Sequence, residues 1–156
     1  MSRSDSAARY QVAGTLLRQG DFSGALSILD ELIATNPNAA PLHFHRSRCL
    51  IALERHDEAA LALDTVLRLA PDHVPALLAR VEVGGKDFDA LALLQRAVQQ
   101  EPDNARAVFL LAEAELVRFD DPQAQARGLA HLDRSLALDP NQPAAFALRA
   151  ERHYNR

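Results

Sequence analysis

The sequence predicts an all-α fold of stacked helix pairs, and three observations support this prediction. First, the 156-residue chain is rich in alanine and leucine and contains 6 glycines, a composition that favours helices over strands. Second, four prolines follow one another at spacings of 34, 31 and 38 residues: Pro37, Pro71, Pro102 and Pro140. Third, the segments that lead up to these prolines align with one another without a gap.

The aligned segments are residues 21–38, 55–72, 86–103 and 124–141. Their fifth column is small in every segment: Ala25, Ala59, Ala90 and Gly128. Their ninth column is always leucine: Leu29, Leu63, Leu94 and Leu132. Their thirteenth column is branched and aliphatic: Ile33, Leu67, Val98 and Leu136. Columns four residues apart share one helix face, so each segment predicts a helix that a neighbouring helix approaches closely.

Proline ends each of these helices, because it lacks an N–H group and clashes with the preceding turn. The Asn or Asp after each proline is expected to cap the next helix: Asn38, Asp72, Asp103 and Asn141. The repeats then span about 6–39, 40–73, 74–104 and 105–142, and a final helix covers about 143–154. We expect them to form one domain over residues 1–156, because a single helix pair cannot bury its faces alone.

Two repeats depart from the ideal length. The third has a shortened first helix, Pro75–Val83, which Gly84 and Gly85 end. The fourth gains about four residues around 119–122, and its second helix is expected from about Gln123 to Leu138. Insertions of this size are expected in turns, where they leave the stack intact.

The repeated pattern of a small residue, three others, a leucine and then a proline resembles the tetratricopeptide-repeat (TPR) family. The turn at Gly20, Asp21 and Phe22 is similar to the family's turn between paired helices. The first helix of each pair matches less well, because its tryptophan position holds Arg9, His43, Leu77 and Val108. The resemblance covers nearly the whole chain. It implies a right-handed helical solenoid of about four TPR-type helix pairs plus a C-terminal capping or half-repeat helix.

The resemblance also implies a protein–protein interaction scaffold or adaptor that binds a peptide or protein segment in a concave groove. An alternative is the N-terminal TPR module of a larger protein, such as a transferase, oxygenase or secretion component, with the chemistry elsewhere. By repeat position, the groove is expected to be lined by Tyr10, Gln11, Leu17, Phe44, His45, Arg48, Leu78, Glu82, Arg106, Phe109, Glu113 and Tyr154.

Charge and composition argue against several other partners. The formal net charge of −4 provides no basic field for nucleic acid or anionic lipid. No uncharged apolar run approaches the roughly 18 residues of a membrane-spanning helix, and residues 1–6 have no apolar core of a secretory signal. Cys49 is the single cysteine, so an internal disulfide is excluded. These features favour a cytoplasmic protein.

No pattern of residues predicts catalysis, a metal or a cofactor. The six histidines lack the spacing of a metal-binding helix, and His43 and His45 point to different sides of a helix. The acidic pairs, such as Asp120 and Asp121, are expected on solvated surfaces rather than in a pocket that perturbs their pKa. Glycine-rich phosphate loops and nucleophile elbows are also missing from the sequence. The prediction is a binding protein without enzymatic activity, bound metal or cofactor.

The final predicted helix raises the question of what covers it. Phe146, Leu148, Ala150 and Tyr154 make much of it apolar, whereas the end of a solenoid normally presents a polar face to water. We therefore expect either that the chain continues past Arg156 or that a second copy covers this helix in a homodimer.

Overall fold

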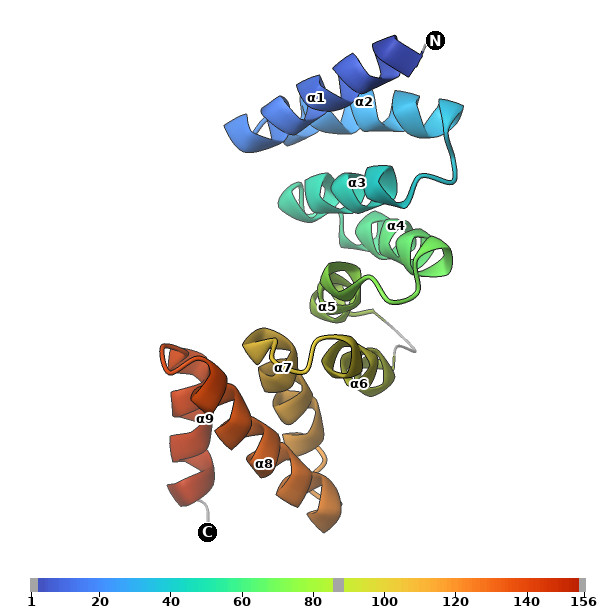
Figure 1. Cartoon of the computed structure of the whole chain (residues 1–156). Coiled ribbons are helices and arrows are strands. Elements are labelled where there is room, and N and C mark those ends of the chain that lie inside the picture. The colour runs from blue at the N-terminus through green and yellow to red at the C-terminus, as the bar shows by residue number, and fades with distance from the viewer. Residues whose placement is uncertain (1–2, 86–88, 155–156) are drawn as a thin grey trace. The chain divides into compact units, whose positions relative to one another are not determined.

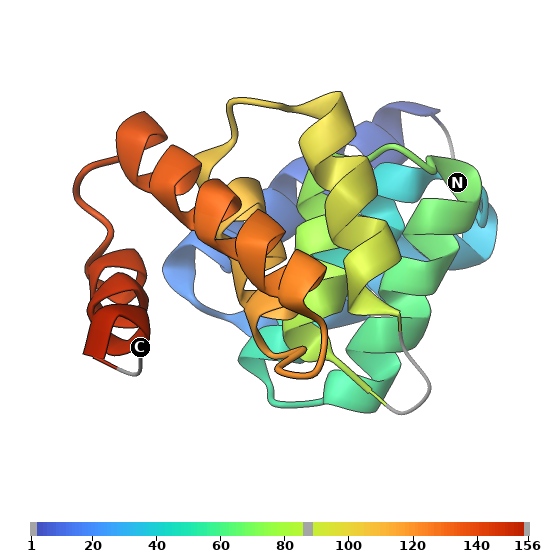
Figure 2. The same cartoon turned by 90° about the horizontal axis from the view of Figure 1, so that it is seen from below.

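The computed structural model describes residues 3–85 and 89–154, and within these ranges it contains nine α-helices and no strand (Figures 1 and 2). The helices are α1 (Arg3–Gln19), α2 (Phe22–Thr35), α3 (Ala40–Ala52), α4 (His56–Leu69), α5 (Val74–Val83), α6 (Ala90–Gln100), α7 (Ala105–Leu116), α8 (Pro122–Leu138) and α9 (Pro143–Tyr154). This arrangement confirms the all-α prediction, and the predicted bounds of α5, α8 and α9 agree to within one residue. None of these helices combines the length and apolar character that crossing a lipid bilayer requires.

The helix ends follow from local hydrogen bonds, but the capping residues differ from the prediction. The caps of α3, α5 and α7 are Ala39, His73 and Asn104, each one residue beyond the Asn or Asp that follows the proline. His73 Nδ1 accepts from Ala76 N at 3.1 Å and Asn104 Oδ1 accepts from Ala107 N at 3.0 Å, whereas Ala39 has no side chain to accept with. The prediction was wrong here because the turn after each proline takes one more residue before the helix begins.

The chain divides into two compact units, an N-terminal unit of residues 1–87 and a C-terminal unit of residues 88–156. Within the N-terminal unit each of the helices α1 to α5 packs against the next, and Figure 1 shows α1 and α2 running in opposite directions. Its core contains the predicted seam residues Ala25, Leu29, Ala59 and Leu63, all 0% exposed. The repeat columns therefore identify buried positions correctly. One domain over the whole chain remains a prediction.

In the C-terminal unit, α6 to α9 also pack in chain order, and Gly128 on α8 lies close to Leu116 and Ala112 on α7. A Cβ atom added there would lie 2.7 Å from Leu116 Cγ and 3.2 Å from the Ala112 carbonyl oxygen. The fifth column is alanine in the other repeats, so the fourth repeat uses glycine where even a methyl group would clash. Gln125 fixes the longer turn between these helices by donating to the carbonyl oxygens of Leu116 and Arg118 at 2.8 and 3.1 Å.

A repeated ion pair joins the second helix of one repeat to the first helix of the next. The three pairs join residues 16 apart: Asp30 with Arg46, Asp64 with Arg80, and Asp133 with Arg149. In each pair the arginine Nε donates to the aspartate Oδ1, at 2.7, 2.7 and 2.6 Å respectively. Between α6 and α7 the corresponding positions hold Gln95 and Leu111. Three of the four junctions thus share a polar contact that the fourth replaces.

Candidate functional site

Tyr10 on α1 is an aromatic side chain that lines two of the hollows of the N-terminal unit. Its ring is 37% exposed and lies 5.7 Å from the ring of His45 on α3, with an angle of 59° between the ring planes. Residues 10, 13, 14 and 17 share one face of α1 because of the helical period, and this face is turned toward α3. Tyr10 lines two separate hollows, one on this face and one beside the N-terminal half of α1.

The first hollow has a volume of about 230 Å³ and lies between α1 and α3. Its lining comes from Tyr10, Ala13, Gly14, Leu17, Arg18, Leu29 and His45. Gly14 borders open space in this hollow, because a Cβ added there would meet only the Arg18 Nη1 atom, at 3.7 Å. Three of the residues that the sequence analysis expected in a groove, Tyr10, Leu17 and His45, therefore share one cavity.

His45 lines this hollow with its imidazole ring, and one nitrogen of the ring is closed off from solvent and has no partner among the described residues. Its Nδ1 atom is buried and makes no hydrogen bond. Burial, and then the positive charge of Arg48, lower the pKa of His45 below the ordinary value of histidine. The imidazole is consequently neutral at neutral pH, when one ring nitrogen donates and the other accepts.

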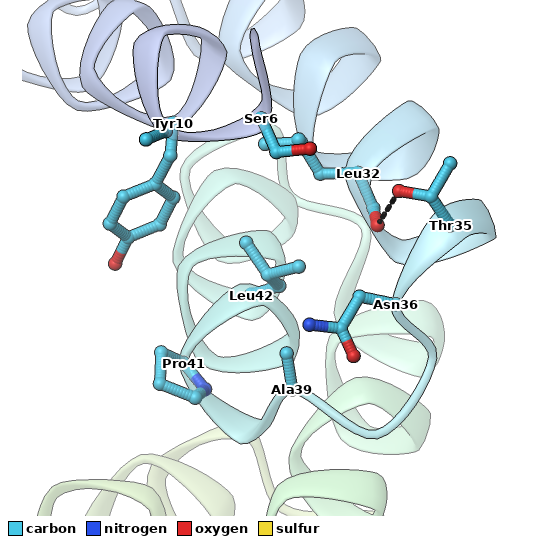
Figure 3. A pocket seen from close by; sticks show the side chains of 9 residues that line it. Ser6, Tyr10, Leu32, Thr35, Asn36, Ala39, Pro41 and Leu42 are labelled. Atoms are coloured by element: carbon cyan, nitrogen blue, oxygen red, sulfur yellow. Dashed lines mark hydrogen bonds between the residues drawn. The ribbon is translucent and has the colours of Figure 1, made fainter. Parts of the chain in front are cut away.

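The second hollow, with a volume of about 530 Å³, is shown in Figure 3. It lies where the end of α2 and the start of α3 meet α1, and its lining comes from Ser6, Ala7, Tyr10, Leu32, Thr35, Asn36, Ala39, Pro41 and Leu42. The Thr35 hydroxyl donates to the Leu32 carbonyl oxygen at 2.9 Å, so it is already used. The amide nitrogen of Asn36 points toward Leu42 (Figure 3). Apart from Tyr10, the sequence analysis included none of these residues, because the hollow forms at helix ends rather than along a periodic face.

The other expected groove residues of the N-terminal unit lie in different surroundings. Phe44 packs against the core residues Leu63, Val66 and Ala76, and its ring lies 4.8 Å from the ring of His73. Leu78 is buried at 7% exposure, while Arg48 and Glu82 are exposed. Gln11 lines a separate hollow of about 420 Å³ on α1, together with Ala8, Val12, Thr15 and Leu16.

The expected groove residues of the C-terminal unit lie mainly on α7. Arg106 is exposed, and Phe109 packs against the core of Ala112, Leu116, Leu132 and Ala145. Partial burial raises the pKa of the Glu113 carboxyl. The side chain of Tyr154 lies outside the part of the chain that the structure describes. A groove formed by residues of both units remains a prediction.

Two further titratable side chains, Glu115 and Cys49, are buried in the described part of the chain. Glu115 is 2% exposed, but His131 Nδ1 and Arg127 Nε lie 2.7 and 3.2 Å from its carboxylate and satisfy it. Burial raises the pKa of the Cys49 thiol, which keeps this side chain in its unreactive protonated form. Within residues 3–85 and 89–154, no three His, Cys, Asp or Glu side chains come together in a way that could hold a metal ion.

Comparison with known proteins identifies the repeat. Models of the tetratricopeptide repeat match residues 16–81 and 78–143, and together they span most of the chain. The chain belongs to the tetratricopeptide-repeat family. Proteins of this family are typically non-enzymatic scaffolds for protein–protein interaction.

Solved structures of TPR proteins have a similar fold. MamA from Desulfovibrio magneticus RS-1 is 26% identical over 90% of this chain and 78% of its own, with a TM-score of 0.75. Another MamA structure is 16% identical over 94% of this chain and 85% of its own, again with a TM-score of 0.75. TTC0263, a thermophilic TPR protein in Thermus thermophilus, is 17% identical over 94% and 80% of the two chains, with a TM-score of 0.64. At identities of 16% and 17%, the likeness concerns the fold alone.

Proposed function

We propose that this TPR protein is an interaction scaffold that holds a peptide or protein segment on the α1–α3 face of its N-terminal unit. The observation that carries the proposal is the position of Tyr10, a half-exposed aromatic side chain between two hollows of about 230 and 530 Å³. Aromatic anchors flanked by concave apolar surface are the usual centres of binding energy in interfaces. The larger hollow also falls in the size range of ligand sites, roughly 300–1,000 Å³.

Apart from Arg18, which lines the smaller hollow, the polar groups around Tyr10 are uncharged, and they suit a peptide backbone as the ligand. His45 is neutral at neutral pH because burial and Arg48 lower its pKa, and the exposed Asn36 carboxamide offers both donors and an acceptor. A peptide bond has the complementary acceptor and donor. We therefore infer that apolar side chains of the ligand occupy the hollows while its backbone meets these polar groups.

The proposal is tested by site-specific photo-cross-linking. A benzoylphenylalanine residue at position 10 should yield adducts with a partner, whereas the same group at Val12, which is 49% exposed and lines a different hollow, should not. The affinity of the partner so identified is then measured by calorimetry. Tyr10→Ala should weaken binding by tenfold or more, while Val12→Ala should leave it unchanged.

The opposite result is also informative. If adducts form equally from both positions, or if Tyr10→Ala binds the partner as tightly as the unchanged protein, the α1–α3 face is not the site. Tyr10→Phe separates the contribution of the ring from that of the hydroxyl. We expect it to retain most of the affinity, since apolar contact is the dominant contribution in this proposal.

A further inference from the structure

Leu61 on α4 is a large apolar residue that is exposed to solvent. Its side chain is 68% exposed. In the repeat alignment its column, the seventh, holds Ser27, Ala92 and Ala130 in the other three repeats, and all three are also exposed. The column therefore faces solvent in every repeat, and the other repeats place only a small residue there. A leucine at this position adds nothing to the core and leaves a large apolar side chain in water.

Leu61 stands between two hollows on the outer side of α4. One, of about 270 Å³, reaches toward α2 and α3 and has Ile33 and Ala62 in its lining. The other, of about 290 Å³, reaches toward the end of α5 and has Ala60 and Val83 in its lining. The apolar surface thus extends from Leu61 into a depression on each side, which a single exposed leucine on a smooth surface would lack.

In the ion pairs around Leu61, the acidic side chains are more exposed to solvent than the basic side chains. Each hollow contains one of the repeated ion pairs, Asp30 with Arg46 and Asp64 with Arg80. In these pairs the aspartate side chains are 50% and 53% exposed, but the arginine side chains are only 25% and 12% exposed. Asp57, also exposed, lines the second hollow. The two hollows are lined by three aspartates, two arginines and the rings of His43 and His56, so the carboxylates outnumber the permanent cations by one, and the aspartates are the charged groups that a partner would reach.

We propose that the outer face of α4 is a second docking surface, for a partner segment in which lysine or arginine side chains flank an apolar residue. The apolar residue packs beside Leu61 in one of the hollows, and the basic groups share the exposed carboxylates of Asp30, Asp57 and Asp64. None of the residues that line the two hollows around Tyr10 belongs to this surface, so it goes beyond the proposed function.

The test uses short amidated peptides of defined chemistry. The probe has lysines on both sides of a central leucine, and a matched peptide has glutamates in place of the lysines. Binding is measured by calorimetry, and the site is mapped by amide chemical shifts. We expect the lysine peptide alone to bind, with shifts at Asp57, Leu61 and Asp64, and with an affinity that falls as salt is added.

Leu61→Ser is the decisive variant, because serine already occupies this column as Ser27 and the fold should be retained. We expect it to weaken binding of the lysine peptide about tenfold. Val12→Ser, which removes another exposed apolar side chain, and Tyr10→Ala should each change it less than twofold. If Tyr10→Ala binds the cross-linked partner as tightly as the unchanged protein, the proposal for the α1–α3 face is overturned but this result is untouched, so the two proposals fail separately.

Several outcomes overturn the proposal. They are no binding of the lysine peptide, equal binding of the glutamate peptide, equal binding by Leu61→Ser, or shifts centred on Tyr10. A fifth is a dimer in sedimentation experiments that Leu61→Ser converts to a monomer, because the occupant would then be a second copy of this chain.

Discussion

The α4–α5 and α6–α7 junctions occupy the same place in successive repeats, yet they hold their helices together by different means. At the first, Arg80 Nε donates to Asp64 Oδ1 at 2.7 Å. At the second, Gln95 and Leu111 stand at the corresponding positions, and Leu111 is only 3% exposed. Both partners have changed together. This position therefore accepts either a charge pair or a buried aliphatic side chain, and we infer that it does not accept a mixture of the two.

The largest effect is expected when an arginine is placed at the α6–α7 junction without its acidic partner. Leu111→Arg places a charge in an apolar site opposite Gln95, which is no counter-ion, and should lower the free energy of unfolding by about 3 kcal/mol or more. Urea unfolding followed by circular dichroism measures the change. Leu111→Met is the matched control and should cost less than about 1.5 kcal/mol. If Leu111→Arg costs no more than this control, the buried position at α6–α7 accepts an unpaired charge as readily as an aliphatic side chain.

The second prediction concerns the charge pair at α4–α5. Arg80→Ala removes the bond to Asp64, the bond from Nη1 to the Gly84 carbonyl oxygen at 2.5 Å, and the packing of a side chain that is 12% exposed. We expect the free energy of unfolding to fall by about 1–2 kcal/mol. Arg80→Lys should recover only part of this loss, because an ammonium group cannot reproduce both bonds. Full recovery by lysine would show that charge alone matters here.

The pair at α8–α9 should contribute less, although its geometry is similar. The side chains of Arg149 and Asp133 are 30% and 56% exposed, so water screens their attraction more than at α4–α5. Arg149→Ala should therefore cost about 0.5 kcal/mol. If Arg149→Ala lowers the free energy of unfolding as much as Arg80→Ala does, the contribution of these ion pairs does not depend on how deeply they are buried.

A double substitution at α6–α7 tests whether an ion pair can replace the buried aliphatic side chain. Adding Gln95→Asp to Leu111→Arg rebuilds the pair of the other junctions, yet it should recover at most about 1 kcal/mol. The reason is that the aliphatic side chain of Leu111 also contributes burial that an ion pair does not replace. Gln95→Asp alone, on an exposed side chain, should change stability by less than about 0.5 kcal/mol. Complete recovery of the free energy of unfolding in the double variant would instead show that the ion pair alone can replace the buried aliphatic side chain.

The smallest effect is expected at His45, which differs from the junction arginines in having an unpartnered buried atom. Its folded pKa lies below its unfolded value, because burial and Arg48 oppose the charged form. The stability that neutral His45 contributes is thus fully present above the unfolded pKa, about 6.5, and is lost as the pH falls through the lower folded value. Thermal unfolding between pH 7 and pH 5 should show this loss, and His45→Gln should reduce it. An unchanged pH dependence in the variant would assign the loss to other groups.

Much of the fold follows from periodicity in the sequence. The column of Leu29, Leu63, Leu94 and Leu132 identified side chains that are all at most 1% exposed, and Gly84, with a φ of +67°, ends α5 as expected. Such positions are predictable because each helix must bury one face and stop at a residue that breaks it. The capping residues were less accessible to prediction, since one additional turn residue moves the cap without changing the pattern.

The candidate site was less predictable than the fold. Repeat positions brought Tyr10, Leu17 and His45 to one hollow, because they lie on the facing sides of α1 and α3. Repeat positions do not predict that Phe44 packs against Leu63 and Val66. This contact depends on how closely one helix pair packs against the next, which the sequence pattern does not specify. The larger hollow at Asn36 was not anticipated, because turns and helix ends shape it and these have no period.

The close approach at Gly128 limits how freely the repeats of this protein can be recombined. A repeat array suggests modules that can be exchanged, duplicated or grafted one helix at a time. Since the other repeats have alanine at this column, an α8 built on their pattern would press a methyl group against Leu116. Helices α7 and α8 are therefore inseparable parts for protein engineering, and any transplant of the fourth repeat into another array should carry both.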